Sequence, residues 1–234
     1  MTSRFAAGSV AVVPLRDGVS GKSRLAAALD PGARRRLVVA LARHVVDVLV
    51  ADERLVGVVV VTADVPFVDA VLSGAAPGLT GSSSSDRQSG LPVRSRTADV
   101  IREPDGRPGL NGALDHARER ARRLGADRML VVHADLPLLT GDDVGAVLTA
   151  DADVVVATDR HATGTNLLSV PLGGHDDGDG FSFRFGPGSR AAHEAEAAAR
   201  GLTSAVVHRT GSAADLDTID DWAGLPAALR ARLL

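Results

Sequence analysis

The apolar residues of the chain follow two alternating patterns. Short continuous apolar runs between polar or turn-forming residues predict buried strands, whereas apolar residues repeating every three or four positions predict helices. The strands are expected at residues 9–15, 56–62, 98–101, 129–133, 153–158, 166–170 and 205–208. The helices are expected at residues 34–52, 64–72, 110–124 and 140–150, and again after residues 188 and 217. Strands that alternate with helices predict parallel βαβ units and an α/β fold.

One stretch interrupts this pattern. Residues 73–96 contain several glycines and a run of four serines, Ser82 to Ser85. Such a low-complexity composition predicts a flexible loop or lid without chemistry of its own. We therefore expect a single domain over residues 1–234 that carries an insert at about 73–96.

The overall composition excludes several classes of function. Hydrophobic residues make up 45% of the 234 residues, and the net charge of −3 gives no basic excess for a nucleic-acid backbone. The absence of cysteine rules out disulfides, thiolate zinc sites and cysteine nucleophiles. The sequence shows neither a signal-peptide pattern nor an apolar run of transmembrane length. We expect a cytoplasmic protein that binds neither nucleic acid nor a membrane.

Acidic residues follow two of the predicted strands. Asp135 comes within two residues of the end of the strand at 129–133. An unpaired carboxylate is costly to bury, and open α/β sheets bind their ligands at the carboxyl ends of strands. Asp135 is therefore a candidate ligand-binding residue, with a turn cap as the alternative. Asp215 and Asp217 lie two residues apart after the last strand, so on an extended segment both face the same side.

Basic and glycine-rich segments lie near these carboxylates in the predicted fold. The loop at 16–24 contains glycines, Arg24 and the only lysine of the chain, Lys22. It is not a Walker P-loop, because arginine occupies the position of the first glycine. Such a loop commonly holds nucleotide phosphates, although a solvated surface loop is the alternative. Asn111 either caps the helix at 110–124 or meets a nucleotide there.

A second anion-binding geometry is expected where Gly186-Pro-Gly-Ser189 opens a helix, beside Arg184 and Arg190. A plain helix cap is the alternative. Two carboxylates from distant parts of the chain suit Mg²⁺, which binds through one or two carboxylates together with substrate phosphates. This set of residues fits nucleotidyl transfer, in which a protein holds two anions in line and neutralises the developing charge.

Several motifs resemble one known family. They are Val13-Pro14-Leu15, Gly21-Lys-Ser-Arg-Leu25, Leu110-Asn-Gly-Ala113, His133-Ala-Asp-Leu-Pro137, Asp159-Arg160, Thr163-Gly-Thr-Asn166, Arg184-Phe-Gly-Pro-Gly-Ser189 with His193, and Asp215-Leu-Asp-Thr218. In this order and spacing, over residues 9–222, they resemble the phosphoenolpyruvate and 2-phospho-L-lactate guanylyltransferases of coenzyme F(420) biosynthesis. The sequence departs from that pattern in its long serine-rich insert and in the pair His133-Ala134 before Asp135.

The resemblance implies a fold and a set of roles. The fold would be a single domain with a mixed, mostly parallel sheet flanked by helices, of the GT-A nucleotidyltransferase type. Catalysis would depend on Lys22, Asp135 and Asp215, and Mg²⁺ would be held by Asp135 and Asp215 with Asp217 close by. GTP would contact Pro14, Leu15, Lys22, Arg24, Asn111 and Gly112. A small phosphorylated three-carbon acid would contact Thr165, Gly186 and Ser189.

The resemblance also implies the reaction. A phosphate oxygen of the acid would attack the α-phosphorus of GTP, pyrophosphate would leave, and the product would pass to a downstream deazaflavin transferase. Phosphoenolpyruvate is the expected acceptor, a preference that rests on the GC-rich, actinobacterial-looking composition. 2-Phospho-L-lactate and 3-phosphoglycerate are the alternatives. A sugar or cofactor nucleotidyltransferase of the same fold and a catalytically silent, nucleotide-binding regulatory protein are the competing hypotheses.

Overall fold

A computed structural model describes residues 8–16, 22–26, 29–73, 98–104, 109–173 and 180–233. Two sequence predictions lie outside these residues. They concern the glycines Gly18 and Gly21 of the basic loop and, apart from Ser73, the insert at 73–96.

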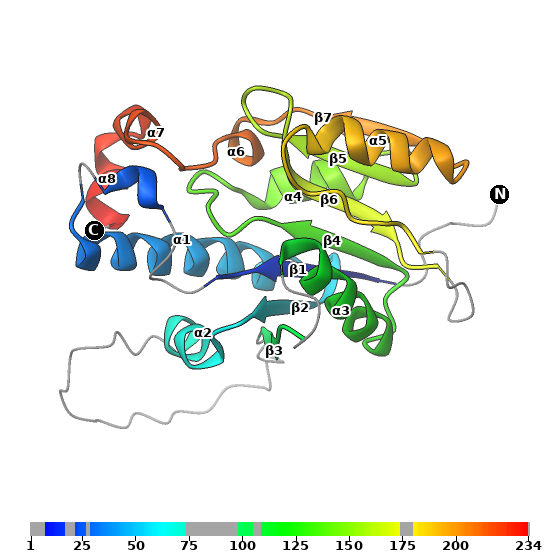
Figure 1. Cartoon of the computed structure of the whole chain (residues 1–234), viewed down its shortest axis with the longest axis horizontal. Helices are drawn as coiled ribbons and strands as arrows, with labels where there is room; N and C mark the ends of the chain where they lie inside the picture. Colours follow the sequence, from blue (N-terminus) through cyan, green and yellow to red (C-terminus); the bar gives the residue numbers. More distant parts are fainter. Residues whose placement is uncertain are drawn as a thin grey trace.

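A seven-stranded sheet forms the centre of the described structure, in the order β3-β2-β1-β4-β6-β5-β7 (Figure 1). The strands are β1 (Ser9–Pro14), β2 (Leu55–Thr62), β3 (Asp99–Arg102), β4 (Arg128–Val132), β5 (Val154–Thr158), β6 (Thr165–Pro171) and β7 (Ser204–Val207). β6 runs antiparallel to its neighbours β4 and β5, and the other neighbouring pairs are parallel. The prediction of an α/β fold with a mixed, mostly parallel sheet is confirmed.

The helices of the described structure are α1 (Pro31–Ala51), α2 (Val65–Leu72), α3 (Leu110–Arg123), α4 (Gly141–Leu148), α5 (Ser189–Ala199), α6 (Thr210–Ala213), α7 (Ile219–Gly224) and α8 (Ala227–Leu233), with a short 3₁₀ helix η1 (Ser23–Leu25). Side chains cap the start of α1, α2, α4 and α7. Thr140 caps α4 and Thr218 caps α7, each in a reciprocal capping box with the aspartate three residues on. The short helices α6 and α8 were not predicted.

Two hydrophobic layers cover the sheet because successive residues of a strand point to opposite faces. In β1, Ala11 and Val13 face the layer formed with α1, α2 and α4. Val10 and Val12 face the layer formed with α3 and α5. Helices α1, α2 and α4 therefore cover one face of the sheet, and helices α3 and α5 cover the other face. None of the described helices is long and apolar enough to cross a membrane.

A third, smaller cluster joins segments that are far apart in the sequence. Its buried members are Leu25, Leu37, Leu41, Leu216, Leu225 and Leu233. Through them η1, the start of α1, the segment before α7 and helix α8 pack together, at the left of Figure 1. This packing fixes Leu25, close after Lys22, against Leu216, which lies between Asp215 and Asp217. The leucine cluster thereby brings the basic loop to the acidic segment.

The start of helix α3 differs from the prediction that Asn111 caps it. Its N-cap is Gly109, at φ 102°, and no side chain caps the helix. The capping interpretation of Asn111 is therefore wrong. The Asn111 amide instead holds the backbone of Phe185: the Phe185 N–H donates to Oδ1 at 2.9 Å, and Nδ2 donates to the Phe185 carbonyl at 3.2 Å. Asn111 fastens the segment that leads into α5 onto the start of α3.

Candidate active site

Lys22 lies between two carboxylates at the carboxyl end of β4. Its Nζ donates to Asp135 Oδ2 at 2.6 Å and to Asp217 Oδ1 at 2.7 Å. The Lys22 side chain is 10% exposed, that of Asp135 25% and that of Asp217 45%. Lys22 adopts a left-handed backbone conformation, φ 60°, which is uncommon for a residue with a side chain and is typical of functional sites. The chain thus holds its only lysine in place against two acids.

The charges at this site do not balance. Burial alone would lower the pKa of Lys22, but Asp135 and Asp217 outweigh it and raise that pKa above its ordinary value. Burial would raise the pKa of Asp135, but Lys22 and His133 hold it below its ordinary value. Burial and the charges of Asp135 and Asp217 raise the pKa of Asp215, against the hydrogen bond from Asn166. Among the described residues, the one ammonium pairs with two of the three neighbouring carboxylates, and no cation pairs with Asp215.

Hydrogen bonds from three strand ends hold the carboxylates together. The Leu216 N–H donates to the Asp135 carbonyl at 3.0 Å, and the His133 N–H donates to the Asn166 carbonyl at 3.0 Å. Asn166 Nδ2 donates to the Ser212 carbonyl at 3.0 Å and to Asp215 Oδ1 at 3.3 Å. Asn166, at the start of β6, thus connects the end of β4 with the acidic segment. Leu216, between the two partly exposed aspartates, is buried.

Arg160 contacts the backbone of the same segment and one of its neighbouring carboxylates. It donates to the Asp215 carbonyl at 2.7 Å and pairs with Asp221 at 2.5 Å. Asp221 in turn accepts the N–H groups of Asp217 and Thr218 at 2.8 and 2.7 Å. The backbone on both sides of Leu216 is therefore fixed, which limits where the two acidic side chains can point.

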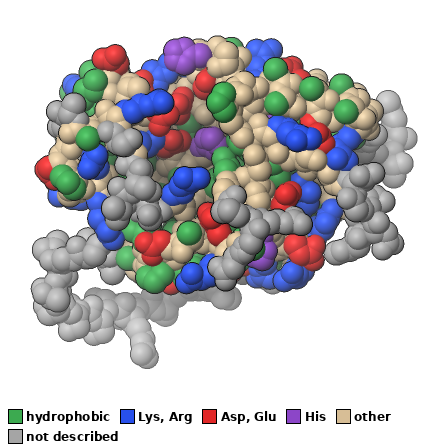
Figure 2. Space-filling model, in the orientation of Figure 1, with side chains coloured by type: hydrophobic (Ala, Val, Ile, Leu, Met, Phe, Trp, Pro, Cys, Tyr) green, Lys and Arg blue, Asp and Glu red, His purple; other side chains and the backbone are tan. Residues whose placement is uncertain are grey.

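A cavity of about 380 Å³ opens beside these groups. Its lining comprises Pro14, Leu15, Arg16, Lys22, Val38, Leu41, Glu103, Leu110, His133, Ala134, Asp135 and Asp217. Figure 2 shows acidic side chains gathered around a hollow on this face of the molecule. Five of the residues predicted to contact the nucleotide or the metal meet here: Pro14, Leu15, Lys22, Asp135 and Asp217. The lining does not include Arg24, Asn111, Gly112 or Asp215, although Leu110, the residue before Asn111, is part of it.

The residues predicted to hold the acid form a separate group next to α5. Ser189 starts the helix after Gly188, which adopts the left-handed conformation at φ 70°, and Gly186 has φ 145°. The Thr165 hydroxyl lies 3.1 Å from Nδ1 of His193, one helical turn beyond Ser189. Thr165 and Ser189 are buried, and none of the three predicted residues lines the cavity beside Lys22. The start of α5 and the carboxylates are linked through His133 and Phe185, whose rings lie 5.3 Å apart.

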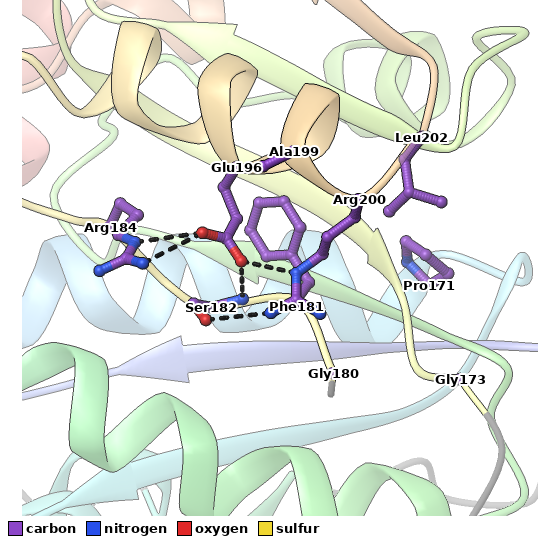
Figure 3. Close-up of a pocket in the computed structure, with 10 residues that line it drawn as sticks. All are labelled: Pro171, Gly173, Gly180, Phe181, Ser182, Arg184, Glu196, Ala199, Arg200 and Leu202. Carbon is purple, nitrogen blue, oxygen red and sulfur yellow. Dashed lines mark hydrogen bonds and ion pairs between the residues drawn. The ribbon is translucent and has the colours of Figure 1, made fainter. Parts of the chain in front are cut away.

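The two arginines expected near the site lie elsewhere. Arg190 pairs with Glu194 at 3.2 Å. Arg184 pairs with Glu196 at 3.1 Å in a second cavity of about 640 Å³, where Arg200 and the Ser182 N–H also contact Glu196 (Figure 3). Burial would raise the pKa of Glu196, but these partners lower it to about 2. The expectation that Arg184 and Arg190 surround the carboxylates is wrong, because acids on α5 engage both guanidinium groups.

The site residues can be tested for their fit to a divalent cation. The described residues contain no group of three or more histidines, aspartates or glutamates placed to hold a metal ion alone. A cation here would depend on two carboxylates completed by phosphate oxygens, as Mg²⁺ does. Among the described residues, Asp135 Oδ1 is buried without a hydrogen-bond partner, and burial together with the charges of Asp135 and Asp217 raises the pKa of Asp215. These observations fit a cation between Asp135 and Asp215, and the metal role of the three aspartates stays a prediction.

Three residues of the site were missed or given no role from the sequence. His133 lines the cavity with a buried Nε2 that has no hydrogen-bond partner, Asn166 binds Asp215, and Arg160 holds the Asp215 backbone. The only sequence signal for His133 was its position two residues before Asp135. Asn166 and Arg160 lay within motifs of the family resemblance, but the direction of their side chains was not readable.

The architecture defines a class of fold. The fold is that of the nucleotidyltransferases: a nucleotidyl transferase from Methanothermobacter thermautotroptrophicus superposes with a TM-score of 0.61 at 18% identity, with 97% of each chain covered. Within this class, the sequence family described as "Guanylyl transferase CofC like" matches residues 88–225.

Full-length relatives agree with that match. A protein named phosphoenolpyruvate guanylyltransferase from Sphaerobacter thermophilus is 35% identical over 215 residues, which is 91% of this chain and 90% of that one. Another of the same name from Rubrobacter xylanophilus is 35% identical over 222 residues, 93% of each chain. The chain belongs to the CofC-like guanylyltransferase family, and the predicted resemblance is confirmed.

Proposed function

We propose that the chain transfers GMP from GTP to phosphoenolpyruvate, giving enolpyruvyl-2-diphospho-5'-guanosine and pyrophosphate. The observation that carries this proposal is the Lys22 ammonium between Asp135 and Asp217, with Asp215 beside them, at the carboxyl end of β4 in a chain of this family. The names of the relatives support phosphoenolpyruvate as the acceptor.

In this reaction a phosphate oxygen of phosphoenolpyruvate forms a bond to the α-phosphorus of GTP. The bond from that phosphorus to the bridging oxygen of the β-phosphate breaks, and pyrophosphate leaves with the electron pair. No protein nucleophile is required, so the chain has to align two anions and neutralise charge. Lys22 serves that purpose, because its raised pKa keeps the ammonium charged at neutral pH.

We place GTP in the cavity lined by Pro14, Leu15 and Lys22. Arg24, two residues after Lys22, would contact a phosphate of GTP from outside this lining. Because the Asn111 amide is already bound to Phe185, the contribution of Asn111 and Gly112 would come from their backbone N–H groups at the start of α3. GTP would therefore contact both the loop after β1 and the start of α3.

Asp135 and Asp215 would hold Mg²⁺, with Asp217 nearby. When bound, the ion would neutralise the phosphates and the departing pyrophosphate. The partnerless Oδ1 of Asp135 supports this assignment. Binding can be followed without turnover: Mg²⁺ is expected to raise the Tm of the protein, and Asp215→Asn is expected to abolish that rise. An equal rise in the variant would contradict the assignment.

Thr165, Gly186 and Ser189 would hold the phospho-acid. The support comes from the left-handed Gly188 before Ser189 and from the buried hydroxyl of Thr165 close by. The product carries an activated phosphoanhydride, which suits a downstream deazaflavin transferase. We therefore place the reaction in coenzyme F(420) biosynthesis, in the cytoplasm where GTP is available.

The test is pyrophosphate release by the purified protein with Mg²⁺. GTP is combined with phosphoenolpyruvate, 2-phospho-L-lactate or 3-phosphoglycerate, and CTP or ATP replaces GTP in parallel. We expect the highest kcat/KM with GTP and phosphoenolpyruvate. A preference for 2-phospho-L-lactate would change the acceptor, and activity with CTP or ATP would indicate a different nucleotidyltransferase. GTP binding without pyrophosphate release from any acid would favour a silent nucleotide-binding protein and refute the proposal.

A matched pair of variants connects this activity to the site. Asp135→Asn removes the carboxylate charge at the end of β4, and we expect kcat to fall by roughly 100-fold or more. Asp142→Asn makes the same chemical change on the exposed first turn of α4 and should leave kcat unchanged. Equal activity of the two variants would disconnect the reaction from this site.

A further inference from the structure

His193 lies where three segments meet. It sits on α5 one turn after Ser189, on the buried face of the helix, and is 0% exposed. Its Nε2 accepts the backbone N–H of Arg184 at 3.0 Å, and its Nδ1 lies 3.1 Å from the Thr165 hydroxyl oxygen. The ring of Phe185 packs edge-on against it at 4.7 Å and fixes its plane.

These partners determine the tautomer of His193. A backbone N–H can only donate, so Nε2 must present its lone pair to Arg184. In a neutral imidazole the proton then lies on Nδ1, which donates it to the Thr165 oxygen. The ring is neutral, because burial lowers the pKa of His193 to about 4 and the charges of His133 and Arg184 act in the same direction, against Glu196.

The tautomer decides what the Thr165 hydroxyl can do. A hydroxyl has one proton to donate, and its oxygen here is already accepting from His193. Within the part of the chain that the structure describes, Thr165 Oγ1 has no hydrogen-bond partner other than His193. Its own proton therefore has no acceptor among the described residues, and a ligand bound at this site would supply one. Carboxylate and phosphate oxygens only accept, so they match this donor.

We propose that His193 is a positioning residue, which orients the Thr165 hydroxyl as an obligatory hydrogen-bond donor to the bound phospho-acid. This inference rests on the proposed function, which places the acid at Thr165, Gly186 and Ser189. The same ring holds the Arg184 N–H and so fixes the segment that enters Gly186. The imidazole thus contacts both the hydroxyl on β6 and the backbone before α5, and the proposed positioning role belongs to its contact with the hydroxyl.

Two substitutions separate the two hydrogen bonds of the ring. His193→Asn places an N–H close to the position of Nδ1 and can still donate to Thr165. His193→Gln places its carbonyl near the position of Nε2 and can accept from Arg184 but does not reach Thr165. We expect the KM for phosphoenolpyruvate to rise about 10- to 100-fold in His193→Gln, to stay within about threefold in His193→Asn, and the KM for GTP to stay constant in both. The reverse order of the two variants would overturn the proposal.

A double-mutant cycle distinguishes positioning from a general structural role. Thr165→Val removes the hydroxyl and keeps the shape of the side chain, and we expect it to raise the KM for phosphoenolpyruvate as His193→Gln does. Adding His193→Gln to Thr165→Val should change kcat/KM by less than about threefold, because the ring would act through a group that is no longer there. Additive losses would show that His193 acts independently of Thr165.

The two hypotheses fail in distinguishable ways. If the wild-type protein releases no pyrophosphate with any of the acids, the proposed function fails and takes the role of Thr165 with it. If the wild type is active but the cycle is additive, only the role of His193 fails. The ¹⁵N NMR shifts of His193 give a further check that needs no turnover. A protonated Nδ1 and an unprotonated Nε2 are expected, and the opposite tautomer would overturn the proposal.

Discussion

Replacing Lys22 by methionine removes the ammonium from between the carboxylates and keeps most of the volume of its stem. Two unit charges about 4 Å apart attract by about 4 kcal/mol at an effective dielectric constant of about 20. The pair with Asp135 is largely buried and dominates, whereas the nearly half-exposed Asp217 adds no more than about 1 kcal/mol. The desolvation of Lys22 offsets part of this attraction, so we expect a loss of about 3 kcal/mol in the free energy of unfolding at neutral pH.

The assay is urea and thermal unfolding of the wild type and Lys22→Met in the presence of EDTA. A loss of about 3 kcal/mol corresponds to a decrease in Tm of about 6–12 °C for a chain of this size. The sign of the pH dependence follows from both partners. The pKa of Asp135 is lowered below 3.8, so its contribution is present above that value and is lost as the pH falls through the folded pKa. The pKa of Lys22 is raised above 10.5, so its contribution is present below that value and is lost as the pH rises through the folded pKa.

The difference between wild type and variant should therefore form a plateau between about pH 4 and pH 10, narrowing on both sides. The double variant Lys22→Met with Asp135→Asn serves as the control, since it leaves no unpaired charge at Asp135 and should be more stable than Lys22→Met alone. A Lys22→Met variant as stable as the wild type, or a double variant less stable than both single variants, would refute the electrostatic account of the site.

Three further predictions concern other parts of the fold. The pKa of His193, ordinarily 6.5, is about 4 in the folded chain. Its contribution to the free energy of unfolding is therefore complete above pH 6.5 and declines by about 3 kcal/mol as the pH falls to 4. Urea unfolding of His193→Phe should show a smaller decline over this pH range, and a decline equal to that of the wild type would contradict this cause. Asn111→Leu leaves the backbone N–H and carbonyl of Phe185 without their partners and should cost about 2–3 kcal/mol in urea unfolding, whereas unchanged stability would mean that water replaces the amide. Gly211→Ala would bring a Cβ to 2.4 Å from a backbone oxygen and should destabilise the fold by about 2 kcal/mol or more. The control Gly224→Ala, whose Cβ would meet nothing within 4 Å, should change the free energy of unfolding by no more than about 0.5 kcal/mol. Similar Tm values for the two variants would contradict the clash.

Local sequence patterns were sufficient to predict most of the secondary structure. The strand at 56–62 and the helix at 64–72 occur within a residue of their predicted bounds, and Thr140 and Thr218 cap the helices that follow them. These features depend on periodicity and on contacts within one turn, which the sequence contains directly. The short helix α6 has too few residues for a periodic pattern, and for that reason it escaped prediction.

The direction of long side chains was harder to predict. Arg184 stands beside a glycine-rich helix start, yet it turns to Glu196, and the Asn111 amide turns to Phe185. Phe185 lies 74 residues from Asn111, and Glu196 lies 12 residues after Arg184, beyond the glycine-rich turn, so neither contact follows from a local pattern. A flexible arginine or an amide takes the nearest unsatisfied group, and that choice depends on the assembled fold.

The sequence by itself determined that Asp135 ends a buried strand, that Asp215 and Asp217 share one side of an extended segment, and that Lys22 is the only lysine. Only the tertiary structure decided that the Lys22 ammonium lies between Asp135, 113 residues away, and Asp217, 195 residues away. The physical reason is that the leucine cluster around Leu25 and Leu216 brings the two segments together. Hydrophobic packing between distant segments, which no local sequence pattern specifies, therefore determines where the charged side chains of the site lie.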